Sequence, residues 1–169
     1  MDVSSVIRAQ FAQTHQILSG IMADVGDATA NRQLPGATVG TIASIYAHLV
    51  LDEDFIVSGM IQGKAPLHVT GDWAAKSGVH SPGSPMQNPE WAAKVKLSPA
   101  FNDYAQAVYA ATDAYLAAAS NDDLARVVET PMGKQPVTSA LGLAIYHHAQ
   151  HSGEIAALKG VFGQKGLPF

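Results

Sequence analysis

Four stretches of the sequence repeat apolar residues at alternating steps of three and four, the spacing that lines them up along one face of an α-helix. In the first stretch the repeat runs through Ile7, Phe11, Thr14, Leu18, Ile21 and Val25. The pattern predicts helices over residues 4–25, 41–62, 98–119 and 138–161. Helices with one apolar face must bury it against one another, so we predict an all-α four-helix bundle that forms a single domain over residues 1–169.

The connections between these segments differ in length, and the longest one constrains the topology. Residues 64–97 join the second predicted helix to the third and contain several glycines and prolines. A segment this long can cross the full length of a bundle, so we expect a long crossover connection between helices two and three. Before the fourth helix, residues 126–129 and 135–137 are expected to form two short extended pieces.

Composition and charge exclude several classes of function. The chain has a formal net charge of −4, 47% hydrophobic residues and no cysteine. A mildly acidic chain gives no sign of the basic surface that binds nucleic acid or an anionic membrane. The N-terminus lacks the pattern of a signal peptide, and no stretch is apolar enough to span a bilayer. The absence of cysteine removes thiolate ligands and nucleophiles and fits a reducing compartment, so we expect a cytoplasmic protein that acts on a small molecule.

Histidines in the fourth predicted helix have the spacing of metal ligands. His147 and His151 are four residues apart, so they face the same way about 6 Å apart along the helix axis. Two imidazoles so placed can share one metal ion, as the histidines of an HExxH motif do. His148 and His151, three residues apart, form a second pair that also suits metal sites in bundles. A third ligand must come from another helix, and His48 lies on the inward face of the second.

Burial favours a metal site over simpler alternatives. A histidine pair at this spacing arises by chance in many chains as rich in histidine as this one, and a lone inward histidine such as His48 is often a hydrogen-bonded core residue. Several histidines and acids on inward faces, however, are costly to bury unless a partner satisfies them, and a metal ion does so. Spacing alone leaves open whether His147 or His148 is the ligand.

Asp52 lies one turn beyond His48 on the same inward face. A lone buried carboxylate is unfavourable, so we expect Asp52 to contact the metal, a ligand histidine or a bound water. The alternative is a hydrated carboxylate at the open end of the bundle. His15, beside the apolar stripe of the first helix, is expected to be structural. His68 and His80 lie in the crossover, and nothing places them near the site.

The run from His147 to Ile155, with the sequence His-His-Ala-Gln-His-Ser-Gly-Glu-Ile, resembles the last-helix signature of the DinB-like superfamily. In that signature a histidine pair spaced HxxxH is followed by a short segment of the Arg-Gly-Gln type. Members of the family are four-helix bundles with a long second connection. Their third metal ligand is a histidine of the second helix, where this chain has Ala47-His48-Leu49. The resemblance extends over essentially the whole chain in helix order and loop lengths.

The resemblance implies one divalent metal ion bound by His48, His147 and His151. It leaves His148 outside the ligand set. The chain departs from the family pattern at two positions, with Ser152 where arginine is usual and Glu154 where glutamine is usual. Glu154 stands one turn beyond the last histidine, where it can orient a ligand, bind the metal, act as a catalytic base or remain a solvated acid. The resemblance and the alanine-rich third helix also suggest a homodimer.

Three neutral imidazoles leave the charge of a divalent ion uncompensated and at least one coordination position open, which is typical of catalytic zinc sites. An open position can bind water and lower its pKa to about 7, or hold a thiol as the reactive thiolate. Zinc is the first expectation and nickel the second, because histidine suits both. Asp52 and Glu154 are the candidate catalytic residues, since each lies within one turn of a predicted ligand and can accept a proton.

Three classes of function fit such a site. The first is a metal-dependent transferase that uses a low-molecular-weight thiol, and the resemblance favours it, because relatives include bacillithiol- or mycothiol-dependent S-transferases and a mycothiol-dependent maleylpyruvate isomerase. The second is a metal-dependent hydrolase that uses bound water. The third is a non-catalytic bundle that binds a metal or a partner. No feature of the sequence names the substrate.

Overall fold

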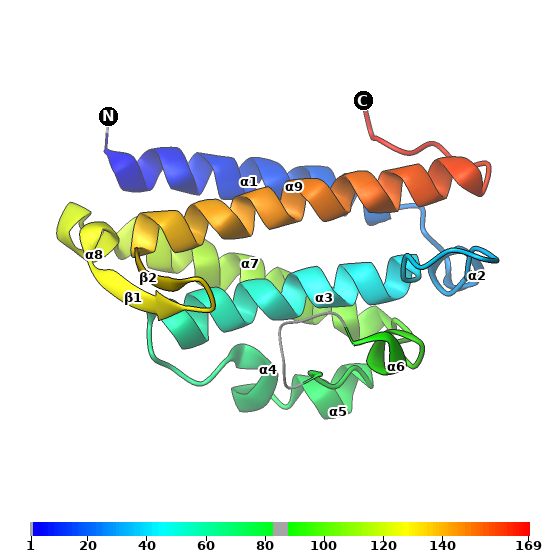
Figure 1. The fold of residues 1–169 in the computed structure, drawn as a ribbon, viewed down its shortest axis with the longest axis horizontal. Coiled ribbons are helices and arrows are strands. Elements are labelled where there is room, and N and C mark those ends of the chain that lie inside the picture. The colour runs from blue at the N-terminus through cyan, green and yellow to red at the C-terminus, as the bar shows by residue number, and fades with distance from the viewer. Residues whose placement is uncertain (1, 83–87) are drawn as a thin grey trace.

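The computed structural model describes residues 2–82 and 88–169 and is mostly helical, with one small antiparallel sheet (Figure 1). The long elements are α1 (Val3–Met22), α3 (Ile42–Asp54), the π-helix η1 (Phe55–Ile61) that continues α3, α7 (Pro99–Ala118) and α9 (Val137–Val161). They lie close to the four segments that the apolar periodicity predicts. In the described parts of the chain, no helix combines the length and the apolar character needed to cross a membrane.

Shorter elements occupy the connections. They are α2 (Asp27–Ala30), α4 (Leu67–Thr70), α5 (Trp73–Ser77), α6 (Pro89–Ala92), α8 (Asn121–Ala125), β1 (Val127–Thr130) and β2 (Gly133–Pro136). The two strands pair in antiparallel fashion with Val128 opposite Gln135, and their ends lie within two residues of the predicted extended pieces. Gly133 makes their tight turn possible, because its φ of 92° lies in the region that favours glycine.

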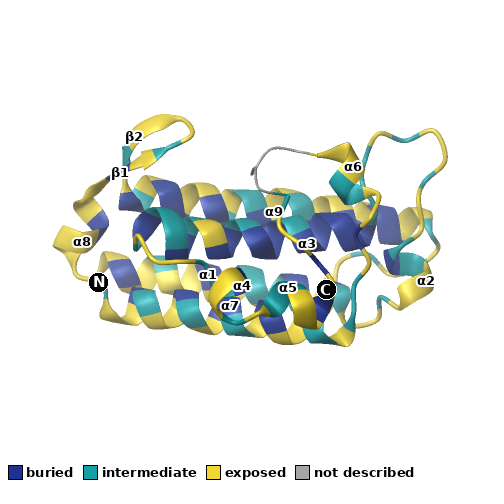
Figure 2. Ribbon diagram, turned by 90° about the horizontal axis from the view of Figure 1, so that it is seen from below, coloured by how far each residue is buried: buried dark blue, intermediate teal, exposed yellow. Residues whose placement is uncertain are grey.

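The long helices pack pairwise around a common core. α9 contacts both α1 and α3, and α7 contacts the same two helices. Figure 1 shows α1 and α9 running side by side, and Figure 2 shows that buried residues line the inner faces of the long helices. The core has two clusters, one that includes Leu49, Tyr104 and Ile155 and one that includes Phe11, Leu116 and Leu141. Because α3 packs on α9, the histidines of these two helices can meet.

The residues at the starts of α3 and α7 behave differently. At the start of α3, the side-chain oxygen of Thr41 accepts a hydrogen bond from the backbone N–H of Ser44 at 3.1 Å and so caps the helix. α7 begins with Pro99 in its first turn, where the missing N–H of proline costs no helical hydrogen bond. Ser98, however, does not cap α7, because its hydroxyl donates to the carbonyl of Ser77 at 3.0 Å.

The end of the second predicted helix departs from the expected pattern. Phe55 and Gly59 continue the three-and-four spacing that begins with His48 and Asp52, so the sequence predicts that they face inward. Phe55 is instead 43% exposed, whereas Val57 and Ile61 are buried. The cause is η1, in which hydrogen bonds span five residues, as between the N–H of Gln62 and the carbonyl of Val57 at 3.2 Å. The wider π-helical turn rotates these side chains away from the α-helical stripe.

Asp54 at the end of α3 organises the start of the long connection. Its carboxylate is buried and accepts hydrogen bonds from the backbone N–H groups of Leu67 at 2.9 Å and His68 at 2.8 Å. The hydroxyls of Ser58 and Tyr104 donate to it at 3.0 Å and 2.8 Å. These contacts satisfy a buried charge and tie α4 and α7 to α3.

We expect Asp54→Ala to lower the free energy of unfolding by about 3–5 kcal/mol, because it leaves several buried donors without an acceptor. Tyr104→Phe removes only one of these donors and should cost about 1–2 kcal/mol. Urea unfolding followed by circular dichroism measures both. Equal costs for the two variants would argue against Asp54 as the organising residue.

Candidate functional site

Packing of α3 on α9 brings together three histidines that are distant in the sequence. They are His48 of α3 and His147 and His151 of α9, and one ring nitrogen of each lies within 4.8 Å of the others. Nε2 of His48 lies 3.1 Å from Nε2 of His147. Two nitrogen ligands at tetrahedral angles around zinc lie about 3.3 Å apart, so this spacing suits a metal ion. We call these residues the three-histidine group.

Burial keeps the imidazoles of His48 and His147 neutral. The side chains of His48 and His147 are 16% and 22% exposed. Burial, and then the neighbouring His151, lowers the pKa of His48 to about 4. Burial, and then the neighbouring His48, lowers the pKa of His147 to about 3. A neutral imidazole keeps a lone pair for a metal, so these two rings can bind an ion at neutral pH without first losing a proton.

Asp52 lies beside the three-histidine group. Its Oδ2 is 3.5 Å from Nε2 of His48 and 3.8 Å from Nδ1 of His147. Burial raises the pKa of Asp52 to about 7. A carboxyl group that titrates near neutral pH can both accept and release a proton. The position is the one expected from the sequence, and the catalytic role of Asp52 stays a prediction.

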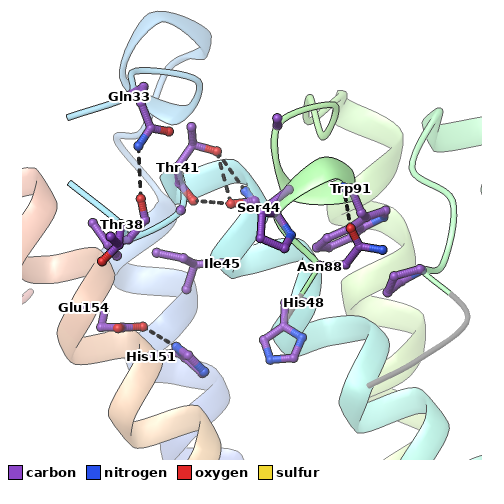
Figure 3. A pocket seen from close by; sticks show the side chains of 16 residues that line it. Gln33, Thr38, Thr41, Ser44, Ile45, His48, Asn88, Trp91, His151 and Glu154 are labelled. Atoms are coloured by element: carbon purple, nitrogen blue, oxygen red, sulfur yellow. Dashed lines mark hydrogen bonds and ion pairs between the residues drawn. The ribbon is translucent and has the colours of Figure 1, made fainter. Parts of the chain in front are cut away.

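Glu154 contacts the third histidine from one helical turn away. Its carboxylate accepts a hydrogen bond from Nδ1 of His151 (Figure 3). When Nδ1 carries the proton, Nε2 keeps the lone pair that a metal would bind. The side chain of Glu154 is 46% exposed, so the carboxylate is also hydrated. Among the roles that the sequence leaves open, this contact best fits the orientation of a ligand histidine.

A second group of metal-ligating side chains lies in the core. His15 of α1, Glu53 of α3 and His148 of α9 each offer an atom within 4.8 Å of the other two. Nε2 of His15 lies 2.8 Å from Oε2 of Glu53, and Nε2 of His148 lies 2.9 Å from the same oxygen. The side chain of His15 is 11% exposed, that of His148 is 1% exposed, and that of Glu53 is fully buried. We call these residues the buried His–Glu–His group.

The surroundings of this group favour an ionised carboxylate. Burial opposes ionisation of Glu53, but the adjacent His148 and His15 bring its pKa down to about 2. The hydroxyl of Thr112 donates to Oε1 of Glu53 at 2.5 Å. The ring of Tyr109 stacks on His15, with the ring centroids 3.8 Å apart and the planes tilted by 16°. Both oxygens of the Glu53 carboxylate therefore have close polar neighbours.

Sequence reasoning missed this second group. His148 and Thr112 lie on the inward stripes of their predicted helices, so their burial could be anticipated. Glu53 gave no signal, because it was one acid in a short acidic run. The sequence predicts a structural role for His15 but not its contact with the buried carboxylate of Glu53. The contacts of Glu53 with His15 and His148 form only where three helices pack together. The periodicity of a single helix does not predict which residues of other helices it will meet.

Two cavities flank the three-histidine group. The first, of about 250 Å³, is lined by His48 and His151 at one end. Figure 3 shows these two side chains facing the cavity below polar residues that include Gln33, Thr38, Thr41, Ser44 and Asn88. The second cavity, of about 160 Å³, is lined by His147 and Asp52. The rest of its wall is largely apolar and includes Phe55, Ile56, Met60 and Leu143. The group thus borders two cavities with largely apolar walls, of which the first also offers several hydroxyl and amide side chains.

The remaining histidines of the long connection have other surroundings. His68 is buried, and its Nε2 lies 2.9 Å from the carbonyl oxygen of Val79. His80 is exposed. Over residues 2–82 and 88–169, neither histidine belongs to either of the two groups described above.

The pKa values predict how the stability of the metal-free protein depends on pH. Folded His48 and His147 stay neutral to about pH 4 and about pH 3, whereas unfolded histidine takes up a proton near pH 6.5. The free energy of unfolding should therefore fall as the pH drops below about 6.5. Asp52 acts in the opposite direction, because its raised pKa lets the folded state take up a proton below about pH 7.

We therefore expect Asp52→Asn to steepen this loss of stability by about 1.4 kcal/mol per pH unit between about pH 5 and pH 6. Urea unfolding with a chelator present measures the slope for both proteins. An identical slope in the variant would contradict the raised pKa of Asp52.

Comparison with known proteins identifies the family. A model of the DinB superfamily matches residues 10–155. A protein from Enterococcus faecalis, described as the conserved protein of its locus, has a similar structure with a TM-score of 0.82 and 23% identity, over 97% of this chain and 99% of that one. A DinB-like protein from Bacillus subtilis has a TM-score of 0.66 and 18% identity, over 96% of each chain. Among curated proteins, none matches the sequence.

The similarity to these two structures shows a shared fold. It does not show a shared activity, because the sequence identities are low. The family match covers most of the chain and includes both His48 and the histidines of α9. The resemblance stated from the run His147–Ile155 is therefore confirmed, and the chain belongs to the DinB superfamily.

Proposed function

We propose that this protein binds a divalent metal ion through His48, His147 and His151 and uses it to transfer a small thiol to an electrophile. The observation that carries the proposal is the convergence of three imidazoles from two helices between two cavities. An all-histidine site leaves a coordination position open. Zinc is the first choice and nickel the second, since both accept imidazole nitrogen.

The chain itself restricts where the thiol comes from. It has no cysteine, so the nucleophilic sulfur must belong to a second small molecule. A divalent ion at this site would favour the thiolate over the thiol, and the thiolate is the reactive form. The proton that the thiol loses needs an acceptor, and Asp52 stands within 4 Å of two of the histidines. The sulfur then forms a bond to the electrophilic carbon, and the leaving group departs with the electrons of its own bond.

The two cavities differ in the polar side chains that they offer. The cavity beside His48 and His151 has a largely apolar wall, but its hydroxyl and amide side chains can bind a sugar-like or peptide-like thiol. The apolar cavity beside His147 and Asp52 fits a small apolar electrophile.

We also propose that the fold is a four-helix bundle with a crossover connection between its second and third long helices. Four long helical segments, each packed on two of the others, support the bundle. The chain between η1 and α7 is the longest connection and contains α4, α5 and α6. The homodimer and the cytoplasmic location stay predictions.

We expect His48→Ala, His147→Ala and His151→Ala each to weaken zinc binding at this site at least about 100-fold, because each removes one of three ligands. His80→Ala, which changes an exposed histidine outside both groups, is the matched control and should bind as the unmodified protein does. Chelator competition measures the affinities, and circular dichroism checks that each variant keeps its helices. Folded variants with unchanged affinity would remove these residues from the ligand set.

The activity itself is tested with the metal-loaded protein and a fluorogenic monohalobimane as a model electrophile, with mycothiol, bacillithiol, glutathione or no thiol. We expect conjugation faster than the uncatalysed reaction of the thiol, and this acceleration should need the metal. Asp52→Asn should lower kcat at least about 100-fold, as the loss of a general base does. His151→Ala removes a proposed ligand, so the variant should lose both the metal and the turnover.

The alternatives give different outcomes in the same assay. Turnover of esters or amides without thiol would indicate a hydrolase, in which Asp52 would act on water instead. A folded, metal-loaded protein that turns over neither kind of substrate would favour a non-catalytic metal-binding role.

A further inference from the structure

The buried His–Glu–His group joins three of the long helices. His15 lies on α1, Glu53 on α3 and His148 on α9. Two imidazole nitrogens converge on the same oxygen of Glu53, at 2.8 Å and 2.9 Å. Charged and polar side chains are rarely this deeply buried unless a specific partner holds them. The three-histidine group contains none of these residues, so this cluster needs an explanation of its own.

Hydrogen bonding within the group leaves one side chain unsatisfied. Glu53 is well provided for, because Thr112 donates to Oε1 and His15 contacts Oε2. Nε2 of His148 is close to Oε2, but it does not meet it with hydrogen-bond geometry. Nδ1 of His148 also lacks a hydrogen-bond partner within the described part of the chain. An imidazole that is 1% exposed thus brings two unsatisfied nitrogens into the core.

We propose that the buried His–Glu–His group binds a second divalent cation, with His15, Glu53 and His148 as its ligands. Two histidines and one glutamate form a ligand set that zinc accepts. A cation would use the lone pair of His148 that finds no donor in the protein. The proposal does not depend on the three-histidine group or on any activity there.

The geometry needs only a small adjustment to admit an ion. Ligand atoms about 2.1 Å from a zinc ion lie about 3.4 Å apart at tetrahedral angles. The nitrogen-to-oxygen separations of 2.8 Å and 2.9 Å are about half an ångström shorter. Rotation of the side chains can open this spacing, while Thr112 and Tyr109 continue to hold Glu53 and His15.

Burial and charge assign this cation a structural role. The carboxylate of Glu53 cancels half of the charge of a divalent ion, whereas the three-histidine group cancels none. The ligand side chains are at most 11% exposed, so a substrate has no access to the ion. A buried ion of this kind stabilises a fold, because an ion that binds only the folded state shifts the folding equilibrium. Here the ion would link α1, α3 and α9.

The test uses a variant in which the first site is removed. The triple variant His48→Ala, His147→Ala, His151→Ala should still bind one equivalent of zinc after loading and desalting, as elemental analysis measures. It should also show a higher thermal midpoint with zinc than with a chelator. Adding Glu53→Gln, which keeps the shape but removes the charge, should abolish both the bound zinc and the shift. A folded triple variant that binds no zinc, or binds it regardless of Glu53→Gln, would overturn the proposal.

A second measurement covers the case in which the triple variant does not fold. The unmodified protein loaded with zinc should hold two equivalents, and Glu53→Gln alone should hold one. His68→Gln, which changes another buried histidine, is the matched control and should keep both. Equal numbers of zinc equivalents in the unmodified protein and in Glu53→Gln would show that the group is an ion pair without a metal.

Discussion

The contact between α3 and α9 is the interaction on which the site depends. His48 alone on α3 is an inward-facing histidine, and the histidines of α9 alone are a spaced pair. Only the packing of the two helices places Nε2 of His48 3.1 Å from Nε2 of His147. The packing depends on apolar surface, with Leu49 and Ile155 in one buried cluster, so the polar site rests on a core that forms without it.

The helical repeat explains how the short acidic run of α3 serves three purposes. Successive residues of an α-helix point about 100° apart, so Asp52, Glu53 and Asp54 leave the helix in different directions. Asp52 reaches the three-histidine group, Glu53 reaches His15 and His148, and Asp54 holds the start of the long connection. The same rule separates neighbours on α9. His147 and His151 share one face, whereas His148 points to the buried group.

Periodicity made the long helices predictable, and spacing made the α9 histidines candidates. A pattern with period 3.6 survives in a single sequence, and so does a spacing of four residues. The sequence did not predict the π-helix, because one wider turn leaves no period of its own and only displaces Phe55 outward. It did not identify Glu53 as a buried acid either. The partners of Glu53 are 38, 59 and 95 residues away along the chain, and only the packed helices bring them together.

The two carboxylates beside the three-histidine group differ in hydration, and this difference suits two tasks. Glu154 is half exposed, lines the larger cavity and contacts Nδ1 of His151, so water reaches the carboxylate that orients the ring. Asp52 is mostly buried and lines the apolar cavity, where its ionised form is poorly solvated. A carboxylate with little water around it gains more from taking up a proton than a hydrated one does. In the proposed reaction, Asp52 is therefore the better proton acceptor and Glu154 the better positioning residue, although each lies one turn from a proposed ligand.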